Sequence, residues 1–178
     1  MSSLDDFRQA KDAFFTRDAQ SPLTADQKRK FTGLTYFPEN PHLRFELQIE
    51  EFPEKQIVEM PTSTGDIQRH IRFGRIRFPV EGQPVELTIY QDAHGYFLPF
   101  VDALAGVETY GAGRYLEPQP LGHNKVLVDF NYAYNPYCAY NERFSCPLTP
   151  WENRLKVAIR AGEKLPEGDW VAHAAYPA

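Results

Sequence analysis

"HLRFELQIEEF", residues 42–52, decides the fold class, because its apolar side chains fall on every second position. Leu43, Phe45, Leu47 and Ile49 alternate with charged or amide side chains. A helix would repeat its apolar positions every three or four residues, whereas a period of two is typical of a strand with one face in water. The stretch therefore predicts a half-buried β-strand.

The chain beyond this stretch continues in the same way. Short runs of β-forming residues alternate with segments rich in Gly, Pro, Asn or Asp. The further predicted strands cover residues 55–60, 66–80, 83–91, 95–102, 108–116, 125–131 and 153–162. Turns at this spacing favour antiparallel pairing over strand–helix–strand units. We therefore predict a mainly β protein, an antiparallel β-barrel or sandwich.

The run at 66–80 changes parity partway along. Ile71 and Phe73 share one face, but Ile76 and Phe78 fall on the other. The apolar face stays continuous if one extra residue is inserted between the two pairs. We therefore predict a β-bulge within one or two residues of Gly74.

Two short N-terminal helices are predicted before the strands. Apolar residues at helical spacing over residues 4–17 are Phe7, Ala10, Ala13 and Phe14. Ser3 and Asp6 have the spacing of a capping pair for this helix, and Thr24 with Gln27 has it for a second, shorter one.

Length and charge restrict the class of protein. A chain of 178 residues is long enough for one domain with a sizeable core, so residues 1–178 are predicted to form a single domain. The 19 basic and 24 acidic side chains leave a net charge of −5, which gives no polycationic surface for nucleic acid. Nucleic acid is therefore not expected as a partner.

The opening residues, "MSSLDDFRQAKDAFF", carry acids where a signal peptide needs basic and apolar segments, and no later run is long enough for a membrane span. We expect a cytoplasmic protein without a membrane partner. Cys138 and Cys146 are too few for a disulfide framework, so both are expected to be reduced and buried. The sequence leaves the oligomeric state open, a homo-oligomer included.

Motifs with a known reaction are absent from the sequence. "YGAGRY", residues 110–115, lacks the third glycine of a dinucleotide loop, and neither a P-loop nor a nucleophile-elbow serine occurs. The five histidines and two cysteines show no metal-ligand spacing. We therefore predict no metal and no cofactor.

Residues 132–153, which we call the cap, are the most unusual segment, because they combine many aromatic residues with both cysteines and have no steady period. Long structureless spans in compact proteins are commonly functional, and this one is too aromatic for disorder. We expect an ordered cap that walls a pocket. If Arg114 points inward it needs a carboxylate, for which Asp129 and Asp102 are the candidates.

Three blocks carry a family resemblance: "FVDALAGVETYGAGRYL", "VLVDFNYAYNPYCAYNERFSCPL" and "ENRLKVAIRAGEK". They resemble the blocks of a widespread prokaryotic family known as domain-of-unknown-function family 1684. The resemblance covers nearly the whole chain and implies a β-rich single domain. It does not imply a reaction.

Three functions remain open. The favoured one is a module that binds a small polar or anionic molecule in a pocket under the cap. Candidate ligand-binding residues are Tyr110, Arg114, Asp129, Asn131, Asn135 and Cys138. The second is a cofactor-free hydrolase-type enzyme with Asp129 as base or Cys138 as nucleophile. The third is a structural interaction protein whose aromatic segment packs against a partner.

Overall fold

A computed structural model describes residues 2–167. The helices are α1 (Ser3–Arg17) and α2 (Ala25–Lys30), and 3-10 turns lie at Pro41–Leu43, Phe130–Tyr132, Tyr137–Ala139 and Trp151–Asn153. The strands are β1 (Arg44–Gln48), β2 (Glu50–Pro61), β3 (Ile67–Val80), β4 (Gln83–Asp92), β5 (Gly95–Phe100), β6 (Arg114–Leu116), β7 (Gln119–Gly122) and β8 (Lys125–Asp129). The predicted mainly β class with two N-terminal helices is confirmed.

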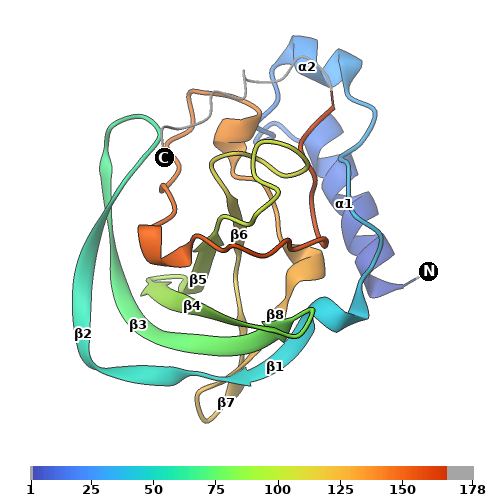
Figure 1. Ribbon diagram of the computed structural model, residues 1–178. Coiled ribbons are helices and arrows are strands. Elements are labelled where there is room, and N and C mark those ends of the chain that lie inside the picture. The colour runs from blue at the N-terminus through green and yellow to red at the C-terminus, as the bar shows by residue number, and fades with distance from the viewer. Residues whose placement is uncertain (1, 168–178) are drawn as a thin grey trace.

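The described strands form two antiparallel sheets and no closed barrel. Five strands pair in the order β2-β3-β4-β5-β6, and three pair in the order β1-β8-β7. The stretch at 42–52 belongs to both sheets, because β1 pairs with β8 and the chain enters β2 directly after the buried Ile49. Figure 1 shows β2 and β3 bending around the core, with α1 on the opposite side of the molecule.

The predicted bulge lies next to Gly74. Arg72 is opposite Tyr90 and Gly74 is opposite Ile89, so Phe73 is the extra residue of β3. A Cβ at Gly74 would lie 2.7 Å from both the carbonyl oxygen of Glu50 and a side-chain carbon of Ile49. The missing side chain therefore allows the start of β2 to approach β3 closely.

Gly74→Ala is expected to lower the free energy of unfolding by about 1–3 kcal/mol, the usual range for overpacking. Two of the three nearest atoms, in Glu50 and Glu51, belong to the backbone, which cannot rotate away as a side chain can. Gly111→Ala is the matched control, since its Cβ would meet only ordinary contacts, the nearest at 3.8 Å. Denaturant melts of both variants test this, and equal losses would contradict the close approach at Gly74.

Buried side chains form two clusters. One, which includes Ile76, Leu87 and Val128, lies among the strands of both sheets. The other joins Phe15 of α1 to Tyr90 of β4 and to cap residues such as Tyr140. The cap and α1 therefore share a core of their own. None of the helices within residues 2–167 is long and apolar enough to cross a membrane.

Two strand predictions and one turn prediction were wrong. Of residues 108–116 only the last three form a strand. The sequence "PLGHN" at residues 120–124 predicts a turn by its Pro, Gly and Asn content, but β7 extends from 119 to 122. Residues 153–162 contain no strand, although Ile159 and Ala161 are buried as their alternation predicts. The first part of this run bonds to the backbone of Val101 and Ala103. The second part is held by side chains: Asp102 accepts the Ile159 N–H at 2.9 Å, and Arg114 donates to the carbonyl of Ala161.

The helices match the prediction with small corrections. Thr24 and Gln27 form the predicted capping box, whereas α1 is capped by Ser2 and Asp5, one residue earlier than expected. Ala13 is exposed instead of lying on the packed face of α1. That face is completed by the buried Leu4 and Phe15.

Candidate functional site

The cap is tied to the sheets by backbone hydrogen bonds. Tyr134 exchanges two bonds with Tyr115 of β6, and Leu148 donates to the carbonyl of Pro61 at the end of β2. The turn after β2 is held to the cap by Ser63, whose N–H donates to the carbonyl of Cys146 at 3.0 Å. The cap therefore has a defined path between the five-stranded sheet and α1.

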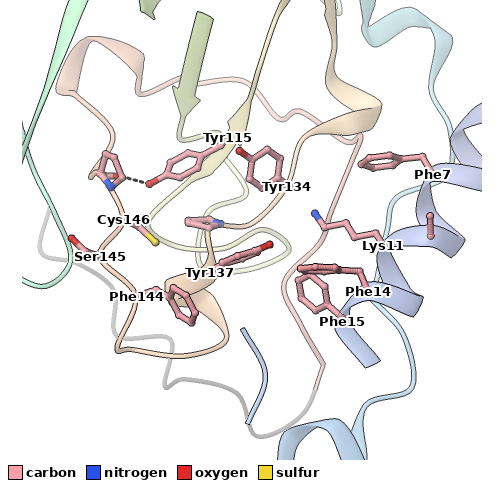
Figure 2. Close-up of a pocket in the computed structure, with 13 residues that line it drawn as sticks. Phe7, Lys11, Phe14, Phe15, Tyr115, Tyr134, Tyr137, Phe144, Ser145 and Cys146 are labelled. Atoms are coloured by element: carbon pink, nitrogen blue, oxygen red, sulfur yellow. Dashed lines mark hydrogen bonds between the residues drawn. The ribbon is translucent and has the colours of Figure 1, made fainter. Parts of the chain in front are cut away.

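A cavity of about 560 Å³ lies between α1 and the cap, and we call it the cap pocket (Figure 2). From α1 it is lined by Phe7, Ala10, Lys11, Phe14 and Phe15, and from β6 and the cap by Tyr115, Tyr134, Pro136, Tyr137, Phe144, Ser145, Cys146 and Pro147. The walls are mostly aromatic, and Lys11 is the only charged side chain among these lining residues. Size and lining are typical of a small-molecule site.

Lys11 is held in place by a buried carboxylate. Its ammonium forms an ion pair with Glu163 and lies 4.7 Å from the centre of the Tyr134 ring. The other oxygen of Glu163 accepts hydrogen bonds from the Tyr140 hydroxyl at 3.0 Å and the Asn135 N–H at 3.1 Å. The Glu163 side chain is only 2% exposed and that of Lys11 16%. The ammonium is therefore fixed at the pocket wall, and the buried Glu163 carboxylate compensates its charge.

Tyr134 connects the cap pocket to a second, polar cavity. Its hydroxyl donates to Glu117, which lines a cavity of about 310 Å³ together with Glu39, Arg44 and Asp129. Burial raises the pKa of the Glu117 carboxyl above its usual value. It also raises the pKa of Tyr134, so this phenol stays protonated and donates to Glu117.

Arg114 is buried, as expected if its side chain points inward. It binds the backbone of residues 159–163 and not a ligand pocket. It is 1% exposed and donates to the carbonyls of Ile159 at 2.8 Å, Ala161 at 2.5 Å and Glu163 at 3.0 Å. The carboxylate beside it is Asp102, at 3.8 Å. Burial lowers the pKa of Arg114 to about 10, which leaves the guanidinium charged at neutral pH. Arg114 is not among the residues lining the cap pocket.

Asp129 and Asn131 lie together away from the cap pocket. Asp129 accepts the backbone N–H of Asn131 at 3.0 Å and its amide at 2.8 Å, so it caps the turn that begins the cap. Asn131 in turn bonds both backbone groups of Asn40, at 2.8 and 2.9 Å. These contacts join the residues just before the cap to the segment before β1.

The other candidates form separate contacts. Asn135 lies behind the cap pocket and donates to Glu163 and to the carbonyl of Lys164. The Tyr110 hydroxyl lies 3.8 Å from the sulfur of Cys138. Cys138 and Cys146 are free and buried, as predicted. The six candidates therefore do not converge on one cavity.

Within residues 2–167, no group of three or more His, Cys, Asp or Glu side chains is arranged to hold a metal ion. His70 is the one histidine buried in the described part of the chain, and it stacks on Phe97 at 5.2 Å. Burial lowers its pKa, which favours the neutral ring.

The sequence prediction missed Lys11, Glu163 and Tyr134. Lys11 falls on the apolar face of α1, between Phe7 and Phe14 at spacings of four and three residues. A lysine within an apolar helical stripe is the signal that could have indicated it. Nothing local in the sequence indicates Glu163, because it meets Lys11 across 152 positions.

The fold and the cap pocket define a two-sheet β protein with an aromatic cavity between its N-terminal helix and a long loop. The chain belongs to the family described as "Protein of unknown function (DUF1684)", whose model matches residues 29–164. This confirms the resemblance seen in the sequence.

A solved structure is similar over most of its length. It is the solution NMR structure of an uncharacterized protein from Haloarcula marismortui, 34% identical, which covers 90% of this chain and 91% of that one with a TM-score of 0.68. No curated protein matches the sequence.

Proposed function

We propose that the protein binds a small molecule with an apolar, preferably aromatic, body and a polar or anionic head group in the cap pocket. The observation that carries the proposal is a single fixed ammonium, Lys11, in an otherwise aromatic wall. Aromatic walls gain from burying a flat apolar body, and a lone charged group orients it.

The head group is inferred from the donors that Lys11 retains. An ammonium has three N–H donors, and within the described part of the chain Lys11 gives one to Glu163. The Tyr137 side chain also lines the pocket, and Figure 2 shows its hydroxyl directed toward the Lys11 side of the cavity. A carboxylate or carbonyl oxygen between these two groups would accept from both.

The placement of the catalytic candidates favours binding over hydrolysis. A nucleophile and its base must lie within hydrogen-bond reach of one another in a shared cavity. Asp129 lines the polar cavity and Cys138 does not, and neither lines the cap pocket. Asp129 and Cys138 therefore share neither of these two cavities, which leaves the hydrolase alternative with weaker support.

Binding is tested with 2-naphthoate, which supplies an aromatic body and a carboxylate, and with the corresponding amide. We expect 2-naphthoate to raise the melting temperature, because a ligand at 100 times its dissociation constant adds about 2.7 kcal/mol of stability. The amide should bind as well but more weakly, since a charged acceptor makes the stronger hydrogen bond to an ammonium.

Ala10→Trp is the decisive variant, because it fills the pocket from an exposed position on α1. Ala13→Trp is its matched control: Ala13 is also exposed on α1 but does not line the pocket. We expect the first variant to lose the ligand-induced shift and the second to keep it. Equal shifts in both variants would place the ligand elsewhere.

A further inference from the structure

Cys138 and Cys146 contact each other, and this contact has no part in the proposed ligand binding. The N–H of Cys138 donates to the sulfur of Cys146 at 3.3 Å, so the two side chains are neighbours. Both residues are held by their backbones: Cys138 lies in the 3-10 turn Tyr137–Ala139, and Cys146 is bonded through its N–H to the Ser63 hydroxyl at 3.1 Å. The contact is therefore fixed by two separate parts of the cap.

The two cysteines differ in their position relative to the cap pocket. Cys146 lines the cap pocket, and Figure 2 shows its sulfur directed into the cavity toward Tyr137. Both residues are buried, Cys138 at 4% exposed and Cys146 at 7%, but Cys138 does not line the pocket and its sulfur lies 3.8 Å from the Tyr110 hydroxyl. A small solute that enters the pocket therefore meets Cys146 first, with Cys138 directly behind it.

We propose that Cys146 and Cys138 form an oxidisable dithiol, in which Cys146 is attacked by hydrogen peroxide through the cap pocket and Cys138 resolves the product as an intramolecular disulfide. A thiol that reaches a cavity beside a second, shielded thiol is the arrangement that reversible cysteine oxidation needs. The proposal does not depend on the ligand of the pocket.

The reaction balances in two steps. The Cys146 thiolate attacks one peroxide oxygen, the O–O bond breaks, and sulfenic acid and hydroxide form. The Cys138 sulfur then attacks the Cys146 sulfur, the S–O bond breaks, and hydroxide leaves and takes the remaining thiol proton as water. The hydroxide from the first step takes up the proton that Cys146 released on forming its thiolate, so two thiols are oxidised to one disulfide and one peroxide is reduced to two waters.

The electrostatics of the pair favour the anion on Cys138, the resolving thiol. The Cys146 thiol donates to Cys138, which lowers the pKa of Cys138 to about 7, with the Tyr110 hydroxyl helping. The same sharing raises the pKa of Cys146 above its usual value. The pair therefore shares one proton near neutral pH with the anion mainly on Cys138, and Cys146 attacks peroxide only after its own proton has moved to Cys138.

The test starts with the reduced full-length protein and hydrogen peroxide, followed by denaturation and a count of free thiols. We expect both thiols to be lost together, with the protein still monomeric on a non-reducing gel and both thiols restored by dithiothreitol. Retention of both thiols under peroxide that oxidises free glutathione, or an intermolecular disulfide, would overturn the proposal.

The order of attack is tested with single serine variants. Cys138→Ser leaves Cys146 without its resolving thiol, so its sulfenic acid should accumulate and be captured by dimedone. Cys146→Ser leaves only the shielded thiol, and dimedone labelling should be about tenfold slower or more. Labelling of the two variants at equal rates would contradict the assigned roles. The thiol count on the unmutated protein decides disulfide formation even if a variant fails to fold.

Discussion

Arg114→Ala is expected to lower the free energy of unfolding by about 3–5 kcal/mol, the usual loss when one partner of a buried ion pair is removed. The variant leaves Asp102 buried beside an empty space. It also frees the carbonyls of Ile159, Ala161 and Glu163, which the guanidinium holds. Residues 159–163 should therefore lose their attachment to β6.

Arg77→Ala is the matched control, because Arg77 lies on β3 with a side chain 54% exposed, paired only with surface carboxylates. Its loss should stay within about 0.5 kcal/mol. Urea melts of the two variants measure the difference. Equal and small losses would mean that Arg114 does not hold the run at 159–163.

Asn153→Ala is the second large expected loss, about 3 kcal/mol or more, because each buried group left without a partner costs about 1–3 kcal/mol. Asn153 is fully buried. Its carbonyl oxygen accepts the N–H of Thr88 at 2.8 Å, and its amide donates to the carbonyls of Thr88 and Pro99 at 2.8 and 2.9 Å. One side chain thus ties the end of the cap to β4 and β5.

Gln48→Ala is the control for Asn153→Ala. The Gln48 amide also donates to a backbone carbonyl, that of His123 at 2.8 Å, but it is exposed, so water replaces the lost bond. We expect a loss within about 0.5 kcal/mol. If Asn153→Ala melts like Gln48→Ala, the three bonds to β4 and β5 do not stabilise the fold as described.

The sequence was sufficient for the longer strands of the two sheets. The alternation at residues 42–52 and the parity change before Gly74 each follow from local side-chain pattern, and both appear in the structure as predicted. The run at 153–162 alternates equally well, but its backbone is bonded partly by Asp102 and Arg114. Periodicity reports which face is buried and not which group satisfies the backbone, so this run could not be distinguished from a strand.

The candidate site was predicted less completely. The cap and its aromatic pocket followed from composition, and the burial of both cysteines was foreseen. Lys11 and Glu163 were not, because they come from opposite ends of the chain and become a pair only in the fold. Arg114 and Asp129 are charged residues that the sequence suggested as ligand-binding. In the structure their side chains form hydrogen bonds within the fold and do not line the cap pocket.

The most direct test of binding in the cap pocket is a map of amide NMR shifts during titration with 2-naphthoate. We expect the largest shifts at Lys11, Tyr134, Tyr137 and Phe144, which line the pocket on both sides. Residues of the polar cavity, such as Glu39 and Asp129, should shift little. Shifts concentrated on the polar cavity, or none at saturating 2-naphthoate, would contradict a ligand site between α1 and the cap.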